Sequence, residues 1–361
     1  MESPPRLFTP IRLRGLELPS RIWVAPMCQY SAREGAPQPW HLVHLGSFAV
    51  GRASLILTEA TAVSPEGRIT AADTGIWSEA LADAWRPVID FVHQQGSRIA
   101  IQLAHAGRKA STRSPHHGRG YAPVEEGGWE TVAPSAVGYG SLPVPRELDA
   151  AGIAGVVDDF VAAARRAVAV GFDAVEVHAA HGYLLHQFLS PLSNTRTDEY
   201  GGDLAGRTRL LLEVIEAVRV AVGPQIPVLV RISATDWVPG GWDLEQSVAL
   251  APLLADVGAD LIDVSSAGLD RGQRIPVGPG YQVPLARAIR DAGPLPVSAV
   301  GLITSPAQAE SILVDDAADV VLVGREFLRD SNLVLRAAAE LGAHLEWPEQ
   351  YRMARFAGSI P

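Results

Sequence analysis

The sequence lacks several features that would place the protein in other classes. Its 361 residues include a single cysteine, Cys28, so the chain cannot form an intrachain disulfide or supply four thiolates to a zinc or iron–sulfur site. It has no apolar run of about 18 residues, the length that a membrane-spanning helix needs. Its first residues, MESPPRLFTP, lack the basic stretch and apolar core of a signal peptide. We therefore expect a cytoplasmic protein with no membrane partner.

Positive charge is also in deficit. The chain has 30 Lys and Arg residues against 40 Asp and Glu, which gives a formal net charge of −10 at pH 7. Such a surface repels phosphate backbones, so we expect no nucleic-acid partner. The apolar fraction of 47% is ordinary for a folded globular chain and excludes disorder over its whole length.

Short apolar runs alternate with longer segments of helical periodicity along the chain. In the longer segments apolar residues recur three and four positions apart, as Leu210, Val214 and Val218 do. The short runs are apolar throughout, which is typical of parallel strands with both faces buried. Predicted strands span residues 22–26, 55–60, 98–103, 174–178, 228–232, 261–265, 297–300 and 320–323. Predicted helices span residues 40–51, 79–95, 153–170, 204–222, 244–257, 283–292, 305–314 and 332–341.

Residues at the ends of these segments support the assignment. Asp203, Asp243 and Ser305 each precede a predicted helix, where a side-chain oxygen can accept from an unpaired amide. Glycines at positions 96, 171, 223, 258 and 293 follow predicted helices, where the chain often turns left-handed. Eight strand–helix units, with no GxGxxG after any strand, favour a closed (β/α)8 barrel of the α/β class over an open doubly wound sheet.

We predict that residues 1–361 form this one barrel domain, with three segments outside the repeating units. Residues 1–20 precede the first strand and are expected to cap the bottom of the barrel. Residues 104–150 form a long insertion after the third strand, and its 106–146 portion contains 12 Gly or Pro residues. A loop this long is usually functional, and here it would roof the site. Residues 343–361 form a C-terminal tail.

Polar residues stand at the predicted C-terminal ends of the strands, where barrel enzymes build their active sites. Arg231 is the most unusual, because it lies in the apolar run PVLVRI and can be buried only with an anionic or strongly accepting partner. That partner is either a ligand or a carboxylate such as Glu176 or Asp263, and the sequence leaves both open. The other strand ends carry Cys28, Gln29, Tyr30, Glu59, Ala60, Thr61, Gln102, His105, His178, His181 and Tyr183.

Glycines follow the last two predicted strands. Gly301 lies in AVGLI, and Gly324 lies in LVGREF beside Arg325. The loops after strands seven and eight are the commonest phosphate site of this fold, because backbone amides there approach an anion closely. Arg325 would add a charge-assisted contact. The alternative is that these glycines only make tight turns.

The segment EVHAAHGY can direct two imidazoles to one spot. His178 and His181 either donate hydrogen bonds to one ligand oxygen or bind a metal, for which Glu59 could be a third ligand. Because a cationic Arg231 in the same cavity opposes a metal ion, we favour oxygen recognition and predict no metal. Tyr183 is either a candidate acid or a tyrosine packed on the next helix. Cys28 alone indicates no more than a buried, inert thiol.

Seven segments spread along nearly the whole chain match one known pattern. They are APMCQYSA (25–32), TEATAVSPEGRIT (58–70), IQLAHAGRKA (101–110), WETVAPSA (129–136), HAAHGYLLHQFLSP (178–191), SNTRTDEYGG (193–202) and LVRIS (229–233). In these segments the sequence resembles the Old Yellow Enzyme family of flavin-dependent ene-reductases, specifically its bacterial xenobiotic-reductase-like branch.

The resemblance implies a cofactor, a reaction and a set of site residues. FMN would bind non-covalently, NADPH or NADH would reduce it, and an activated alkene would accept the hydride from flavin N5 in a ping-pong cycle. Arg231 would stabilise the anionic reduced flavin. His178 and His181 would bind a substrate carbonyl oxygen, Tyr183 would protonate the α-carbon, and Tyr30 would line the pocket. The implied flavin-binding residues are Ala25, Pro26, Met27, Cys28, Ala60, Gln102, Arg231, Gly301, Gly324 and Arg325.

The resemblance also implies a homo-oligomer, a dimer or tetramer, in which a residue from one subunit's tail can enter its neighbour's active site. Tyr351, Arg352 and Arg355 are candidates, and none is assigned. Competing functions are a metal-dependent barrel hydrolase using His178, His181 and Glu59, a flavoprotein acting on tRNA, and a dienoyl reductase. The acidic charge argues against tRNA, and a single cysteine cannot hold the iron–sulfur cluster of a dienoyl reductase.

Overall fold

Eight parallel strands close into a barrel in the computed structural model, which describes residues 4–355. Neighbouring strands follow the order β10-β11-β12-β3-β4-β5-β8-β9, so each strand pairs with the next along the barrel. The barrel strands are β3 (Ile22–Val24), β4 (Leu55–Ala62), β5 (Arg98–Ala104), β8 (Ala174–Ala179), β9 (Val228–Ser233), β10 (Leu261–Ser265), β11 (Val297–Ala299) and β12 (Val320–Val323). The predicted (β/α)8 barrel is confirmed, with strand ends within two residues of expectation.

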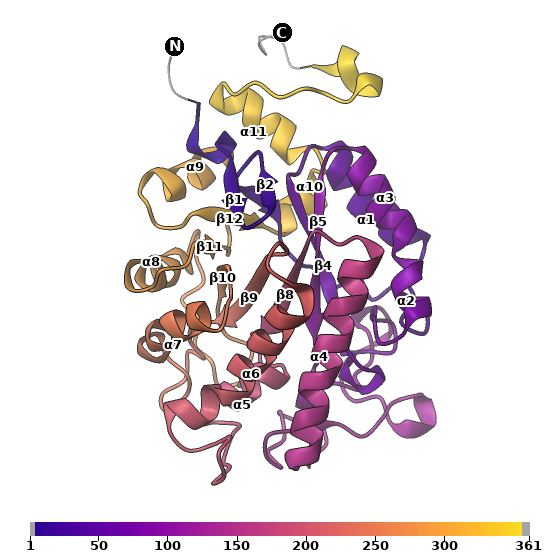
Figure 1. Cartoon of the computed structure of the whole chain (residues 1–361), viewed down its shortest axis with the longest axis vertical. Coiled ribbons are helices and arrows are strands. Elements are labelled where there is room, and N and C mark those ends of the chain that lie inside the picture. Colours follow the sequence, from indigo (N-terminus) through magenta and orange to yellow (C-terminus); the bar gives the residue numbers. More distant parts are fainter. Residues whose placement is uncertain (1–3, 356–361) are drawn as a thin grey trace.

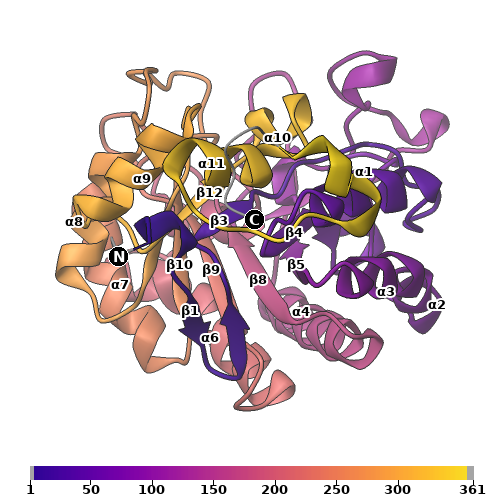
Figure 2. The ribbon, with the colours of Figure 1, turned by 90° about the horizontal axis from the view of Figure 1, so that it is seen from above.

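Helices surround the strands on the outside of the barrel (Figures 1 and 2). The predicted helix over residues 79–95 is divided at Trp85, where Pro87 stands in the first turn of the second piece. Sequence periodicity did not identify the two short helices α5 and α10. The helices are α1 (Pro39–Val50), α2 (Glu79–Ala84), α3 (Arg86–Gln94), α4 (Ala150–Val170), α5 (Leu184–Leu189), α6 (Leu204–Val222), α7 (Leu244–Asp256), α8 (Val283–Ala292), α9 (Pro306–Val314), α10 (Arg325–Arg329) and α11 (Leu333–Leu341).

Side chains on both faces of the strands are buried, as the continuous apolar runs predicted. One apolar cluster fills the space between strands and helices. A second fills the barrel interior and includes Trp23, Leu229 and Leu322. The hairpin of β1 (Ile11–Leu13) and β2 (Leu16–Leu18) contributes its inward residues to this interior cluster, so it closes one end of the barrel.

Most of the predicted helix boundaries are confirmed by their hydrogen bonds. The side chains of Asp203, Asp243 and Ser305 each accept from the backbone amide three residues on. Gly171 has a φ of 111° after α4, as a left-handed helix end requires. The expectation at Gly293 is wrong, because its φ of −120° is extended and the chain leaves α8 directly toward β11.

The segments outside the barrel contain only short elements. The region 104–150 holds three single-turn helices, η3 (Gly107–Lys109), η4 (Pro115–His117) and η5 (Val124–Glu126), and two strands, β6 (Val132–Ala133) and β7 (Arg146–Glu147). Tyr351 and Arg352 lie in η6 (Glu349–Ala354) and are exposed. Within residues 4–355, the longest apolar helix falls short of what a membrane crossing requires.

Candidate active site

Strand register aligns a buried layer of polar side chains across the barrel. Gln102 on β5 pairs with Glu176 on β8, and its amide nitrogen donates to the carboxylate at 2.6 Å. Asp263 on β10 pairs with both Arg231 on β9 and Ser298 on β11. Ser298 donates to Asp263 Oδ1 at 2.7 Å. Each group in this layer therefore meets a partner on an adjacent strand.

Arg231 forms an ion pair within that layer. Its Nε lies 3.0 Å from Asp263 Oδ2, and both side chains are almost fully buried. The carboxylate partner that the sequence left open is therefore Asp263, whereas Glu176 binds Gln102. Because this ion pair already accounts for the buried guanidinium, burial alone does not indicate a ligand at Arg231. What does point to a ligand is that Arg231 also lines a cavity.

That cavity has a volume of about 310 Å³ and lies at the C-terminal ends of β3, β9, β11 and β12. Ala25, Pro26 and Met27 form one side of it, and the glycine turns at Gly301 and Gly324 form another. A Cβ built on Gly324 would meet Met27 Sδ at 3.5 Å and Ala25 Cβ at 3.9 Å, so the backbone here faces the cavity. Seven of the ten predicted flavin-binding residues, counting Arg231 and Arg325, therefore line this one cavity.

The turn end of this cavity is suited to an anion. The backbone amides of Gly301, Leu302 and Gly324 donate to no other residue within 4–355, so they remain available to a ligand. Arg325 also lines the cavity, is exposed and has no acidic partner among these residues. Amide donors beside a guanidinium form a phosphate-binding arrangement, and the predicted FMN carries one phosphate. The cavity thus fits the cofactor that the sequence indicates.

His178, His181 and Tyr183 come together beside Arg231. The ring of His178 lies 5.2 Å from the ring of His181 and 5.1 Å from the ring of Tyr183, between centroids. His178 pairs with Arg231 in the sheet register, so this cluster adjoins the cavity. Tyr183 is the N-cap residue of α5, and its side chain makes no capping hydrogen bond to that helix.

Hydrogen bonds orient the two imidazoles. The Ala180 amide donates to His178 Nδ1 at 3.3 Å, which leaves Nε2 to carry the proton. His181 Nε2 lies 2.7 Å from the hydroxyl of Ser265, which leaves Nδ1 without a partner within the described chain. Each ring thus keeps one nitrogen for a ligand. Sequence reasoning missed Ser265, whose only signal was its place at the end of a strand.

Burial and positive charge keep both imidazoles neutral. Desolvation lowers the pKa of His178 and of His181 well below 6.5, and the nearby Arg231 lowers them further. Desolvation also raises the pKa of Tyr183 well above 10, so its hydroxyl remains protonated. The site therefore presents neutral N–H and O–H donors, which suits an oxygen that gains negative charge during a reaction.

Cys28 and Tyr30 lie on the loop after β3, which Glu59 holds in place. Glu59 accepts from the Gln29 amide at 2.9 Å, and its other oxygen lies 2.8 Å from His41 Nε2. Burial raises the pKa of the Cys28 thiol and that of the Tyr30 hydroxyl. Glu59 is thus engaged away from His178 and His181, and residues 4–355 contain no group of three or more side chains that could hold a metal ion.

Ala60 and Gln102 complete the predicted set. They are register partners on β4 and β5, next to an irregularity in the pairing between Leu57 and Ala60. Both side chains are buried, at 6% and 2% exposure. Gln102 lies in the polar layer beside Glu176, and neither Ala60 nor Gln102 lines the cavity at the glycine turns.

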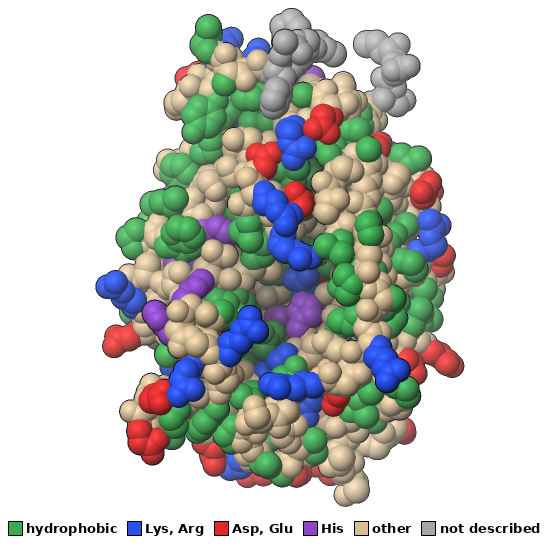
Figure 3. All heavy atoms as spheres, turned by 180° about the vertical axis from the view of Figure 1, so that it is seen from behind, with side chains coloured by type: hydrophobic (Ala, Val, Ile, Leu, Met, Phe, Trp, Pro, Cys, Tyr) green, Lys and Arg blue, Asp and Glu red, His purple; other side chains and the backbone are tan. Residues whose placement is uncertain are grey.

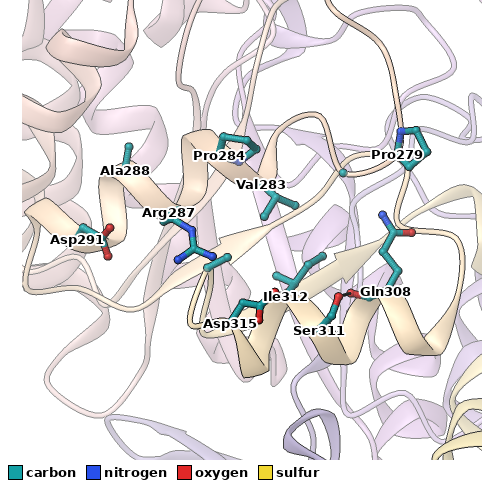
Figure 4. A pocket seen from close by; sticks show the side chains of 12 residues that line it. Pro279, Val283, Pro284, Arg287, Ala288, Asp291, Gln308, Ser311, Ile312 and Asp315 are labelled. Atoms are coloured by element: carbon teal, nitrogen blue, oxygen red, sulfur yellow. Dashed lines mark hydrogen bonds between the residues drawn. The ribbon is translucent and has the colours of Figure 1, made fainter.

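A larger cavity of about 570 Å³ lies elsewhere, between α8 and α9 on the outside of the barrel (Figure 4). Val283 and Ile312 form its apolar wall, and Arg287, Asp291 and Asp315 form its rim. None of the predicted site residues lines it, and it opens between outer helices instead of at the strand ends. The smaller cavity at Arg231 is therefore the candidate active site.

Positive side chains gather near the candidate site although the chain is acidic overall. One face of the molecule is hollowed, with imidazoles inside the hollow and Lys and Arg side chains around it (Figure 3). Arg108, Lys109 and Arg271 each approach the ring of Tyr139, at 5.7, 4.8 and 5.6 Å from its centroid. Such a local excess of positive charge attracts phosphate-bearing ligands.

The buried His105 at the end of β5 gives a pH-dependent prediction. Burial lowers its pKa to about 4, so the unfolded chain takes up this proton first as the pH falls through about 6.5. Stability from the neutral ring is present above that pH and is lost toward pH 4. The variant His105→Gln keeps an acceptor for the Gly107 amide. Between about pH 6.5 and pH 4, we expect its midpoint of urea unfolding to fall less than that of the wild type. The exposed His117→Gln should follow the wild type, and equal slopes in all three proteins would contradict the assignment.

Comparison with known proteins gives consistent matches over most of the chain. The model of the NADH:flavin oxidoreductase / NADH oxidase family matches residues 6–343. The NADPH dehydrogenase of Bacillus subtilis is 43% identical over 349 residues, covering 96% of this chain and 98% of that protein. A NADH:flavin oxidoreductase of Gibberella zeae is 44% identical over 364 residues, covering 96% and 88%. The structure of morphinone reductase, 32% identical, superimposes with a TM-score of 0.79 over 97% of this chain and 93% of that one.

Proposed function

Because this chain belongs to the NADH:flavin oxidoreductase / NADH oxidase family, the Old Yellow Enzyme type of flavoprotein, we propose that it reduces the activated C=C bond of α,β-unsaturated carbonyl compounds. It is an FMN-dependent oxidoreductase with NAD(P)H as its reductant. The observation that carries the finer proposal is the convergence of two neutral imidazoles and one tyrosine hydroxyl beside the Arg231 cavity.

Residues of the cavity would hold FMN from both ends. The amides of Gly301 and Gly324 and the Arg325 guanidinium would bind the phosphate. The segment 25–28 would lie along the ring system, with Ala60 and Gln102 at its far edge and Arg231 supplying positive charge. When bound, FMN supplies the hydride chemistry that links the nicotinamide reductant to the alkene.

His178 and His181 would bind the carbonyl oxygen of the substrate. Each neutral ring keeps one nitrogen free for the ligand, that of His181 donating in the tautomer whose Nε2 accepts from Ser265, and the 5.2 Å between centroids lets both reach a single oxygen. As the β-carbon gains a hydride, negative charge moves onto that oxygen and both hydrogen bonds strengthen. Donors fixed in a buried site stabilise such charge without having to reorganise.

Tyr183 would supply the proton that completes the reduction. Its ring lies 5.1 Å from that of His178, which places its hydroxyl near a substrate held by the imidazole pair. The raised pKa keeps this hydroxyl protonated at the pH of reaction, as a general acid must be. Tyr30, on the loop after β3, would border the same substrate.

A two-step spectroscopic experiment tests the proposal. We expect the purified protein to be yellow, to bleach with NADPH without oxygen, and to regain its colour when 2-cyclohexenone is added. Cyclohexanone, which lacks the C=C bond, is the matched control and should leave the protein bleached. Protein that is colourless and takes up no FMN would contradict the cofactor site. Protein that bleaches but responds to neither ketone would contradict alkene reduction.

A further inference from the structure

Lys109 is an exception in the composition of this chain. Of its 30 Lys and Arg residues, it is the only lysine. It ends the single-turn helix η3, two residues after β5, and is partly buried. Every other residue in that set is an arginine. The one lysine of the chain therefore lies at the end of the barrel that carries the candidate active site.

The Lys109 ammonium joins two loops that follow different strands. Its Nζ donates to the carbonyl oxygen of His181, after β8, at 2.7 Å, and to that of Gly268, after β10, at 2.8 Å. No carboxylate within residues 4–355 pairs with it. The charge is therefore satisfied only by two carbonyl oxygens, which leaves it electrostatically available to other groups in the site.

These two loops approach each other more closely than side chains would allow. A Cβ built on Gly182 would lie 2.2 Å from the Gly268 oxygen, and one on Gly268 would lie 2.6 Å from the His181 backbone. His181 itself has a φ of 57°, which is unfavourable for a residue with a Cβ. Because this contact brings two carbonyl oxygens together, it needs a donor between them, and the Lys109 ammonium supplies one.

The same ammonium faces the proposed proton donor. Its Nζ lies 5.1 Å from the ring centroid of Tyr183 and 4.8 Å from that of Tyr139. When Tyr183 gives up its proton it becomes negative, and a cation at this distance stabilises that charge. Burial, together with Arg108 on its own helix and Arg271 on the loop after β10, lowers the pKa of Lys109 to about 8.

We propose that Lys109 is a positioning residue of this active site, holding His181 in its left-handed turn against Gly268 and supplying positive charge beside Tyr183 as that tyrosine loses its proton. This inference rests on the proposed roles of His181 and Tyr183. It also explains the choice of lysine, because a compact ammonium fits between two converging carbonyls whereas a planar guanidinium does not.

The test separates the two half-reactions in the FMN-loaded enzyme. We expect Lys109→Met to slow reoxidation by 2-cyclohexenone at least about tenfold, while reduction by saturating NADPH, which needs no proton from Tyr183, stays within about threefold. Lys109→Arg keeps the charge and should recover part of that rate. Arg113→Met, which removes an exposed cation of the same insertion, should match the wild type. Equal slowing of both half-reactions, or of neither, would overturn the inference.

Ligand binding gives a second readout that needs no turnover. We expect 4-chlorophenol, whose oxygen stands in for the substrate carbonyl, to bind at least about tenfold more weakly to Lys109→Met and measurably more weakly to Lys109→Arg, followed by the change in the flavin absorption band. Unchanged affinity in both variants would refute the positioning role. Because this titration measures binding alone, it stays informative about Lys109 even if the wild type fails to reduce enones, which would refute the proposed function instead.

Discussion

Tyr183→Phe is expected to slow the reoxidation of reduced enzyme by 2-cyclohexenone by about 10²- to 10⁴-fold, the usual contribution of a general acid. The variant removes one oxygen atom and keeps the ring that contacts His178 and Lys109. Binding of the enone should therefore change little. Reduction of the flavin by NADPH should keep its rate, because that step takes no proton from Tyr183. Stopped-flow absorbance of the two half-reactions measures both.

A matched tyrosine serves as the control for this prediction. Tyr200 donates to Glu213 at 3.1 Å near the start of α6, outside the site. Tyr200→Phe should leave both half-reactions as in the wild type. If Tyr183→Phe reoxidises within about threefold of the wild type, the proton comes from another group or from water, and the role assigned to Tyr183 is wrong.

Arg231→Met is expected to destabilise the protein by about 3–5 kcal/mol, because it leaves Asp263 buried without its ion-pair partner. It should also reduce retention of FMN, since Arg231 lines the cofactor cavity. The measurements are the midpoint of urea unfolding of the FMN-free protein and the fraction of FMN that remains bound after dialysis. Arg86→Met, which breaks an exposed pair with Asp83, should cost no more than about 1 kcal/mol.

A double variant separates the structural role of Arg231 from its role toward the cofactor. The double variant Arg231→Met with Asp263→Asn removes both charges. The amide oxygen that it places at position 263 can still accept the hydrogen bond from Ser298. We expect it to recover much of the lost stability, because no uncompensated charge stays buried. FMN retention should stay low, because the guanidinium is still missing. Recovery of both properties together would mean that Arg231 contributes only to folding.

The fold was predictable from the sequence because its signals are local and repeated. The eight strands follow from apolar runs, and Asp203, Asp243 and Ser305 mark helix starts as expected. The short helix α5 was not predicted, since six residues are too few for a periodicity to show. The extended Gly293 shows the converse, because a glycine after a helix permits a left-handed turn but does not require one.

The candidate site was predictable as a set of residue types but not as a set of contacts. Polar side chains at strand ends identified His178, His181 and Tyr183, and the structure places the rings of His181 and Tyr183 each about 5 Å from the ring of His178. The partner of Arg231 remained open between Glu176 and Asp263. Strand register decided it, because Asp263 stands directly beside Arg231 on the neighbouring strand and Glu176 stands beside Gln102.

The sequence alone predicts that this chain forms a parallel barrel and which polar groups stand at its open end. Both predictions depend on local signals, namely the apolar runs and the polar residues that directly follow them. Tertiary structure alone decides which of those groups touch. The convergence of His181 and Gly268 on Lys109 joins segments that follow three different strands. No spacing in the sequence encodes that meeting, because it depends on how closing the barrel brings distant loops to one point.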